Sequence, residues 1–201
     1  MKICIVEDLK FKNFFPLVSF IYVSNLRSGC FTLKERVGKI FKEKNIFEMG
    51  RNSILKIDKS HISIDFKGEG EVLFLNSRVM FTEKIMSQIK KKSKTNSIFV
   101  NQDGEIVGVK ISQFSKWNNK NILFDESFFE NDFKDFSIQK IEAKFFNYIW
   151  DIIQFNFDAI KFDFQFFKKK KKNQIAQLYK FSKYNFWKKN FNWKKCCIRC
   201  N

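Results

Sequence analysis

Proline and histidine are almost absent from this sequence of 201 residues, which contains one of each, and glycine occurs only seven times. The single histidine, His61, excludes sites built from several imidazoles, and no Ser/His/Asp or Cys/His arrangement can be assembled around it. The few glycines form neither the Walker A spacing nor the dinucleotide-binding fingerprint. No apolar run approaches the roughly 20 residues of a membrane-spanning helix. These absences exclude several large enzyme classes and give no reason to predict a membrane span.

Cysteine is scarce outside the last six residues, which hold three of the five: Cys196, Cys197 and Cys200, against Cys4 and Cys30. Cys197 and Cys200 have the spacing of half a zinc site, but the sequence offers no second pair. We therefore expect free thiols in a reducing compartment. Charged residues interrupt the apolar start, so no signal peptide is predicted and we expect a cytoplasmic protein.

The chain is rich in phenylalanine and lysine, with 28 Phe residues, 44% hydrophobic residues and a net charge of +17. We attribute the Phe excess first to a base composition rich in adenine and thymine, and the hydrophobic content suffices for the core of one ordinary domain. The segment from Lys168 to Asn201 holds 12 of the 38 Lys and Arg residues and none of the 21 acids. The rest of the chain is only mildly basic, so we do not expect nucleic acid to be its partner.

Apolar runs and alternating residues predict an α/β fold. Runs at residues 3–6 and 72–75 have the length of buried strands, and the second suits the centre of a sheet. Residues 97–100 and 105–111 are predicted to form a hairpin whose turn ends in Gly104. The remaining predictions are strands at 53–57, 62–66 and 162–166, helices that begin after Thr32 and Thr82, an amphipathic helix at 141–153, and a mostly irregular segment at 112–140.

The bend before the first predicted helix has the features of a phosphate-binding site. A glycine lets the backbone turn tightly, the start of a helix presents unpaired amides with partial positive charge, and two arginines add full charges. The ordinary alternative is a helix that merely begins after a glycine-containing turn and carries arginine for solubility. The residues concerned are Arg27, Ser28, Gly29, the capping-box pair Thr32 and Glu35, and Arg36.

Three stretches of the sequence resemble a known family in the same order. They are Pro16-Leu17 with Leu26-Arg27, Gly29, Thr32 and Glu35-Arg36; then Leu75-Asn76-Ser77-Arg78-Val79; and then Trp150-Asp151-Ile152-Ile153 with Asn156, Ile160 and Asp163-Phe164. They are similar to sugar-nucleotidyltransferase-like proteins related to the bifunctional uridyltransferase/acetyltransferase of glucosamine 1-phosphate. The resemblance spans nearly all of residues 1–165.

The resemblance implies a Rossmann-like nucleotidyltransferase domain, with a mixed sheet and flanking helices, over residues 1–167. It also implies a reaction in which a sugar 1-phosphate and a nucleoside triphosphate give a nucleotide sugar and pyrophosphate, with Mg²⁺ as the cofactor. A second implied possibility is a non-catalytic domain at the start of a hexapeptide-repeat acyltransferase. Such repeats usually trimerise, so a homotrimer would follow if a hexapeptide domain came next.

The resemblance also assigns roles to particular residues. Arg27 and Arg36 would be the catalytic cations that hold the triphosphate, with Arg36 standing where the family usually has Lys. Ser28, Gly29, Thr32, Asn76 and Arg78 would complete the nucleotide and phosphate site. The sequence departs from the family after residue 75, where active members commonly supply a metal-binding Asp and this chain has Asn76, Ser77 and Arg78. Glu7 and Asp8, which follow the first strand, are the remaining candidates for holding a metal.

The segment at residues 168–201 differs in character from the rest, with five consecutive lysines and then no periodic pattern. Runs of lysine codons favour reading-frame slips, and a shift by one base would turn both Trp-Lys pairs, at 187–188 and 193–194, into glycines six residues apart. Six is the period of the hexapeptide β-helix, so we expect this tail to be out of frame or disordered, and the chain a fragment. The alternative is a genuine basic tail that binds single-stranded nucleic acid through phosphate contacts and stacking.

Overall fold

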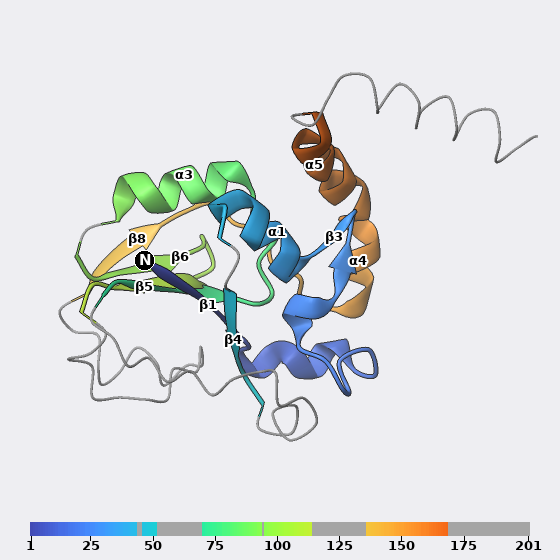
Figure 1. Ribbon diagram of the computed structural model, residues 1–201. Helices are drawn as coiled ribbons and strands as arrows, with labels where there is room; N and C mark the ends of the chain where they lie inside the picture. Colours follow the sequence, from blue (N-terminus) through green and yellow to red (C-terminus); the bar gives the residue numbers. More distant parts are fainter. Residues whose placement is uncertain (44–45, 52–69, 94, 114–135, 169–201) are drawn as a thin grey trace, which may run out of the picture. The chain divides into compact units, whose positions relative to one another are not determined.

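The computed structural model describes residues 1–43, 46–51, 70–93, 95–113 and 136–168, and Figure 1 shows their arrangement. The chain divides into two units, Met1–Phe162 and Asp163–Asn201, and the fold described below is that of the first. The strands predicted at 53–57 and 62–66, His61, the last three cysteines and the tail lie outside the described residues.

A six-stranded mixed sheet forms the centre of the first unit, in the order β4-β1-β5-β7-β6-β8. Strand β1 (Lys2–Val6) pairs in parallel with β4 (Ile46–Met49) and with β5 (Val72–Asn76), and β7 (Ile106–Ile111) runs antiparallel to both β5 and β6 (Ser97–Val100). Strand β8 (Ser137–Lys140) closes the order, parallel to β6. This sheet and its helices confirm the predicted α/β class.

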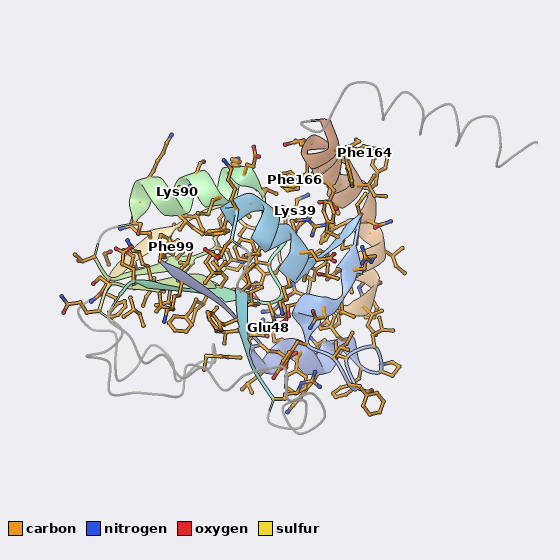
Figure 2. All side chains as sticks on the ribbon, in the orientation of Figure 1. Lys39, Glu48, Lys90, Phe99, Phe164 and Phe166 are labelled. Atoms are coloured by element: carbon orange, nitrogen blue, oxygen red, sulfur yellow. The ribbon has the colours of Figure 1, made fainter. Side chains whose placement is uncertain are left out.

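Helices α1 (Leu33–Phe41) and α3 (Glu83–Lys92) cover one face of the sheet, as Figure 1 shows. Their apolar stripes pack on the side chains of that face in one buried cluster. Both helix starts are capped as predicted: Thr32 and Glu35 form a complete capping box, and Thr82 accepts a hydrogen bond from the amide of Ile85. In Figure 2 the lysine Lys90 extends outward from α3, whereas Phe99 lies buried in the sheet.

Loops and short elements gather around a second buried cluster next to the sheet. They are the 3₁₀ turns η1 (Leu9–Phe14) and η2 (Val23–Asn25), the small strands β2 (Arg27–Ser28) and β3 (Phe31–Thr32), and helices α4 (Ile149–Gln154) and α5 (Asn156–Lys168). Phe14, Val18, Val23, Phe146 and Ala159 are among the residues buried there. Among the described residues, none of the helices combines the length and apolar character that crossing a membrane requires.

Two predictions of secondary structure between residues 141 and 168 were wrong. Residues 141–148 are not helical, and only Ile149–Gln154 of the predicted helix forms, because the backbone of the earlier part bonds to neighbouring segments. The amide of Ile141 donates to the carbonyl of Val100, and that of Phe146 to the carbonyl of Arg78. The predicted strand at 162–166 lies inside α5, because the alternation of phenylalanines does not outweigh a helix that has already begun at Asn156. Strands β4 and β8 were not predicted.

Candidate functional site

The carboxyl ends of β1 and β5 lie side by side, and the chain leaves β1 toward β4 and returns to β5 on its other side. Open α/β sheets bind their ligands at such a reversal of strand order, outside the carboxyl ends of the strands. Five polar residues follow directly on these two strand ends and all are buried: Glu7, Asp8, Asn76, Ser77 and Arg78. This edge is the candidate site.

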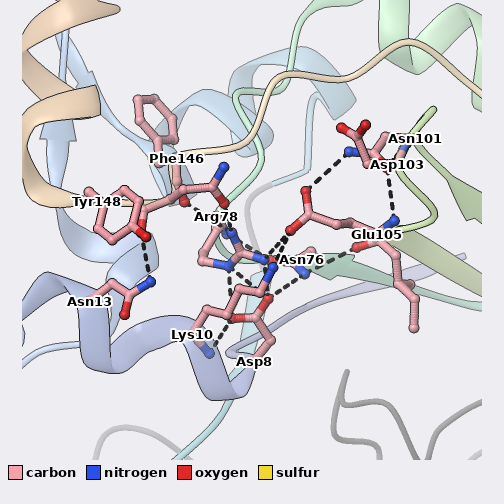
Figure 3. Close-up of polar contacts among 12 residues, drawn as sticks. Asp8, Lys10, Asn13, Asn76, Arg78, Asn101, Asp103, Glu105, Phe146 and Tyr148 are labelled. Carbon is pink, nitrogen blue, oxygen red and sulfur yellow. Dashed lines mark hydrogen bonds and ion pairs between the residues drawn. The ribbon is translucent and has the colours of Figure 1, made fainter.

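Arg78 connects the two strand ends through Asp8, as Figure 3 shows. The Nε of Arg78 lies 2.8 Å from Oδ1 and 2.7 Å from Oδ2 of Asp8, and its Nη2 lies 2.7 Å from Oδ2. Asn76 donates from Nδ2 to the same Oδ2 at 3.0 Å. The other side of the guanidinium donates to the Phe146 carbonyl at 3.1 Å and to Oδ1 of Asn147 at 2.6 Å. Arg78 thus ties β1, β5 and the segment before α4 together.

Glu105, at the start of the β6–β7 hairpin's second strand, extends this network. Its carboxylate lies 3.2 Å from Nη2 of Arg78 and 2.7 Å from Nζ of Lys10, and it accepts a hydrogen bond from Asn101 at 3.1 Å. Burial alone would raise the pKa of Glu105, but the hydrogen bonds and charges of Lys10 and Arg78 outweigh burial and lower that pKa. Glu105 is therefore held as a carboxylate between two cations. Asn101, Asp103 and Gly104 make the turn beside it, with Gly104 in the left-handed region as predicted.

Glu7 forms a separate buried ion pair with Arg51. The Nε of Arg51 lies 2.7 Å from Oε2 of Glu7, and the amide of Val23 donates to Oε1 at 3.0 Å. Burial raises the pKa of the Glu7 carboxyl, and the contact with Arg51 opposes that rise without cancelling it. A third buried carboxylate, Glu48 on β4, pairs with Lys34 at 2.6 Å. Each of these carboxylates near the strand ends therefore forms an ion pair with an arginine or lysine side chain.

The predicted phosphate bend has a different arrangement from that expected. The side chain of Arg27 is 58% exposed, with Nη2 lying 3.7 Å from a Glu35 oxygen. Arg36 is 0% exposed and donates from Nη2 to the carbonyl of Ser28. The amide of Gly29, which has φ 78°, donates to Oδ1 of Asn156 at 2.6 Å. The structure therefore presents Arg27 to solvent and places Arg36 beneath the bend as a support for its backbone.

A hollow of about 440 Å³ lies next to the hairpin end of the Arg78 network. The start of α3, the turn at 101–103, the segment at 142–144 and the first half of α5 line it, and Asn101 belongs to both the hollow and the network. Met80, Ile85 and Phe162 give it apolar surface, and ion pairs between Lys84 and Glu142 and between Lys144 and Asp158 lie on its rim. This volume is within the range of small-molecule sites, about 300–1,000 Å³.

Glu7 and Asp8 do not fit the role of metal ligands in this arrangement. Mg²⁺ binds through carboxylate and water oxygens, and the oxygens of both residues already face guanidinium groups. The described part of the chain contains no group of three or more His, Cys, Asp or Glu residues placed to hold a metal ion. Burial raises the pKa of the Cys4 thiol, and neither Cys4 nor Cys30 forms a disulfide within the described part of the chain.

The sequence names Asp8 as a metal candidate and Asn76 and Arg78 as phosphate-binding candidates, and the structure brings these three side chains together. The sequence does not indicate three further residues that contact the strand ends. Lys10, Arg51 and Glu105 reach the strand ends through side-chain contacts that link positions 27 to 95 residues apart. Glu105 lies in the correctly predicted hairpin, but its place in the site depends on the pairing of β7 with β5, which brings the start of β7 beside the end of β5 that carries Asn76. For Arg51 the sequence contained no signal, since the strand that carries the chain to it was not predicted.

Comparison with known proteins identifies the chain's family. A family model described as sugar nucleotidyl transferase matches residues 3–172. A search of curated proteins finds no match. The fold is similar to that of a protein described as a glucose-1-phosphate thymidylyltransferase from Bacillus anthracis, in complex with a sucrose, with 7% identity and a TM-score of 0.50 over 80% of this chain and 95% of that chain. HddC from Yersinia pseudotuberculosis is similar with 8% identity and a TM-score of 0.48, over 79% and 99%. Because the family model covers well over half of the residues, the chain belongs to the sugar nucleotidyl transferase family.

Proposed function

We propose that this chain transfers a nucleotidyl group from a nucleoside triphosphate to a sugar 1-phosphate at the carboxyl edge of β1 and β5. A phosphate oxygen of the sugar phosphate attacks the α-phosphorus, the bond from that phosphorus to the bridging oxygen breaks, and pyrophosphate leaves. The observation that carries the proposal is the position of Asp8, Asn76 and Arg78 at the reversal of strand order, in a chain of this family. Catalysis of this kind depends on positioning and charge stabilisation.

The hollow beside Asn101 is our proposed place for the sugar ring. It combines apolar surface with amide and carboxylate groups that can bind hydroxyls, and it shares Asn101 with the network at the strand ends. Replacing the lining residue Ala143 with tryptophan should therefore raise the KM for the sugar phosphate. The KM for the nucleoside triphosphate should stay unchanged, and an equal rise in both would contradict this placement.

Arg27 is our proposed phosphate-binding catalytic residue at the bend. It is the exposed cation there, whereas Arg36 is buried and acts on the Ser28 carbonyl. We propose that Arg36 positions Ser28 and Gly29, with Thr32 fixing the helix start behind them. We likewise propose a positioning role for Asn76 and Arg78, which hold the ends of β1 and β5 together through Asp8. A charge-assisted contact to phosphate is worth about 1.5–3 kcal/mol, which corresponds to roughly 10- to 150-fold.

Mg²⁺ is the cofactor that the family resemblance implies, and it would neutralise phosphate charge in the transfer. Glu7 and Asp8 are occupied by Arg51 and Arg78, so these two carboxylates would not hold the ion. The same observation favours a second candidate function. In that alternative the domain binds a nucleotide or sugar phosphate without turnover and serves the acyltransferase of a protein like the bifunctional enzymes that the sequence resembles.

Release of pyrophosphate tests the proposal. Purified protein is incubated with Mg²⁺, a hexose 1-phosphate and each common nucleoside triphosphate in turn. Arg27→Ala should lower kcat/KM about 10- to 150-fold. Lys90→Ala, which removes an exposed lysine from α3, is the matched control and should not change the rate. Binding of the nucleotide without any release of pyrophosphate would favour the second candidate, and absence of both would refute the two together.

A further inference from the structure

We propose that Arg51 and Arg78 take the place of a divalent cation at Glu7 and at Asp8 respectively, so that the two strand-end carboxylates bind no metal. This inference rests on the proposed function for the location of the site. It concerns these two carboxylates alone, and it does not depend on whether the chain turns substrate over.

The carboxylate of Asp8 has its acceptor positions occupied by donors from the chain. Oδ1 accepts from the amide of Lys10 at 3.2 Å and from Nε of Arg78 at 2.8 Å. Oδ2 accepts from Asn76 at 3.0 Å and lies 2.7 Å from both Nε and Nη2 of Arg78. A carboxylate offers about four lone-pair positions, and these contacts use them all. A metal ion could reach Asp8 only by displacing Arg78.

The carboxylate of Glu7 is enclosed in a comparable way. Arg51 lies 2.7 Å from Oε2 and 3.4 Å from Oε1, and the Val23 amide lies 3.0 Å from Oε1. Gly50 closes a further side, because a Cβ placed on it would lie 2.9 Å from Cβ of Glu7 and 3.0 Å from Oε2. The space beside this carboxylate is thus smaller than a methyl group needs, and no hydrated ion fits there.

Both guanidinium groups also donate hydrogen bonds to groups other than the two carboxylates. Nη2 of Arg51 donates to the carbonyls of Val18 and Ile21, at 2.8 Å in each case. Nη1 of Arg78 donates to the Phe146 carbonyl and to Asn147. Moving either arginine aside would break these hydrogen bonds and leave a buried positive charge without its partner, which is strongly unfavourable. The arginines are therefore permanent parts of this edge.

The charges at this edge balance without a metal. Two carboxylates face two guanidinium groups, and the nearby Glu105 faces Lys10 as well as Arg78. A divalent ion bound to these carboxylates would be repelled by the guanidinium groups of Arg51 and Arg78, which lie 2.7 Å from the same oxygens. The phosphate charge of a substrate would then be met by an exposed cation such as Arg27, and not by an ion on Glu7 and Asp8.

Titration with Mn²⁺ alone, followed by NMR on the labelled full chain, tests the inference directly. A paramagnetic ion on these carboxylates would broaden the amide signals of Glu7 and Asp8 selectively. The amide of Ser97, the first residue of β6, lies at the end of the strands opposite Glu7 and Asp8 and is the internal control. We expect the Glu7 and Asp8 signals to broaden no more than that of Ser97. Selective broadening at Glu7 and Asp8 would overturn the inference.

A second arm asks whether the guanidinium is what keeps the ion out. In Arg51→Met the carboxylate of Glu7 loses its cation, and we expect Mn²⁺ affinity, measured by electron paramagnetic resonance, to rise at least about tenfold over the wild type. A folded Arg51→Met protein without that gain would overturn the inference. If the variant does not fold, the wild-type NMR result decides alone.

The outcome is separable from that of the proposed function. Release of pyrophosphate in the presence of Mg²⁺, with no selective Mn²⁺ effect at Glu7 or Asp8, supports both. Failure of every nucleotide to bind refutes the proposed function and leaves the Mn²⁺ result standing. Nucleotide binding with selective broadening at Glu7 and Asp8 refutes the inference and leaves the function.

Discussion

Replacement of Arg78 by methionine removes the cation that connects β1, β5 and the segment before α4. Methionine keeps an unbranched apolar stem, so packing against Phe145, whose ring centroid lies 5.0 Å from the guanidinium carbon, is largely retained. What is lost is the pairing of Asp8 and the hydrogen bonds to the Phe146 carbonyl and to Asn147. The substitution therefore isolates the polar role of this side chain.

The magnitude follows from the burial of the pair. Arg78 and Asp8 have side chains that are 2% and 5% exposed, so removal of one leaves an uncompensated buried charge. Breaking such a pair costs about 3–5 kcal/mol. In a protein of about 200 residues each kcal/mol lowers Tm by about 2–4 °C, so we expect Arg78→Met to lower Tm by roughly 10 °C.

Lys110→Met is the matched control for this experiment. Lys110 lies in the same sheet, and its side chain, which is 15% exposed, makes an ion pair of 2.9 Å with Glu71, whose side chain is 46% exposed. Its loss changes the net charge equally but should cost less than about 1 kcal/mol, because water screens the pair. Thermal unfolding followed by circular dichroism at neutral pH compares the two variants.

Two outcomes would refute the reasoning. The first is an Arg78→Met protein whose Tm lies within about 3 °C of the Lys110→Met control, which would mean that the buried pair contributes no more than an exposed one. The second concerns the double variant Asp8→Asn with Arg78→Met. Removing the orphaned charge should recover part of the lost stability, because the penalty arises from that charge. A double variant less stable than Arg78→Met would contradict this.

Three further predictions concern Glu7, Gly108 and Thr32. Burial raises the pKa of Glu7 in the folded state, so the fold binds more protons than the unfolded chain above pH 4.5, and stability should fall as pH rises from there through the folded pKa. Urea unfolding midpoints measured from pH 4 upward should show a weaker decline in Glu7→Gln, and an unchanged pH dependence would contradict the assignment. Gly108→Ala would place a Cβ 2.7 Å from the carbonyl oxygen of Phe74, so we expect a loss of about 1–3 kcal/mol in chemical denaturation, and no loss would mean that β5 and β7 pair in another register. Thr32→Ala removes the α1 cap and should cost about 1 kcal/mol, whereas Thr32→Ser, which keeps the hydroxyl, should cost much less.

The elements that could be predicted from the sequence are those whose signal is local. The runs that became β1 and β5 are apolar at every position because both faces of the sheet are covered there. The caps at Thr32 and Thr82 need only residues within one turn, and the hairpin at 101–104 needs only its own glycine. Each of these features depends on a segment of fewer than about ten residues.

The elements that could not be predicted depend on partners far along the chain. Strand β4 has its place because β1 offers a parallel edge to Ile46–Met49, and β8 because β6 does the same for Ser137–Lys140. Ile141 and Phe145 recur at a helical spacing, yet both are buried against the sheet from an extended segment. Apolar spacing alone does not separate these cases, since an i, i+4 pair also occurs on one side of an extended chain.

The arginines show where a prediction of the site from sequence could have gone further. The sequence predicts the same phosphate-binding role for Arg27 and Arg36, but one is exposed and the other is completely buried. Helical periodicity distinguishes the two, because only Arg36 lies in α1. It follows Leu33 by three residues and precedes Val37 by one, which places it beside the apolar stripe of the helix. An arginine at such a position faces the core and is buried only where hydrogen-bond acceptors meet it, as the Ser28 carbonyl does here. The same reasoning applies to Arg78, because it closely follows a strand that is buried along its whole length, and its position in the sequence therefore favours an internal connection over a solvent-exposed cation.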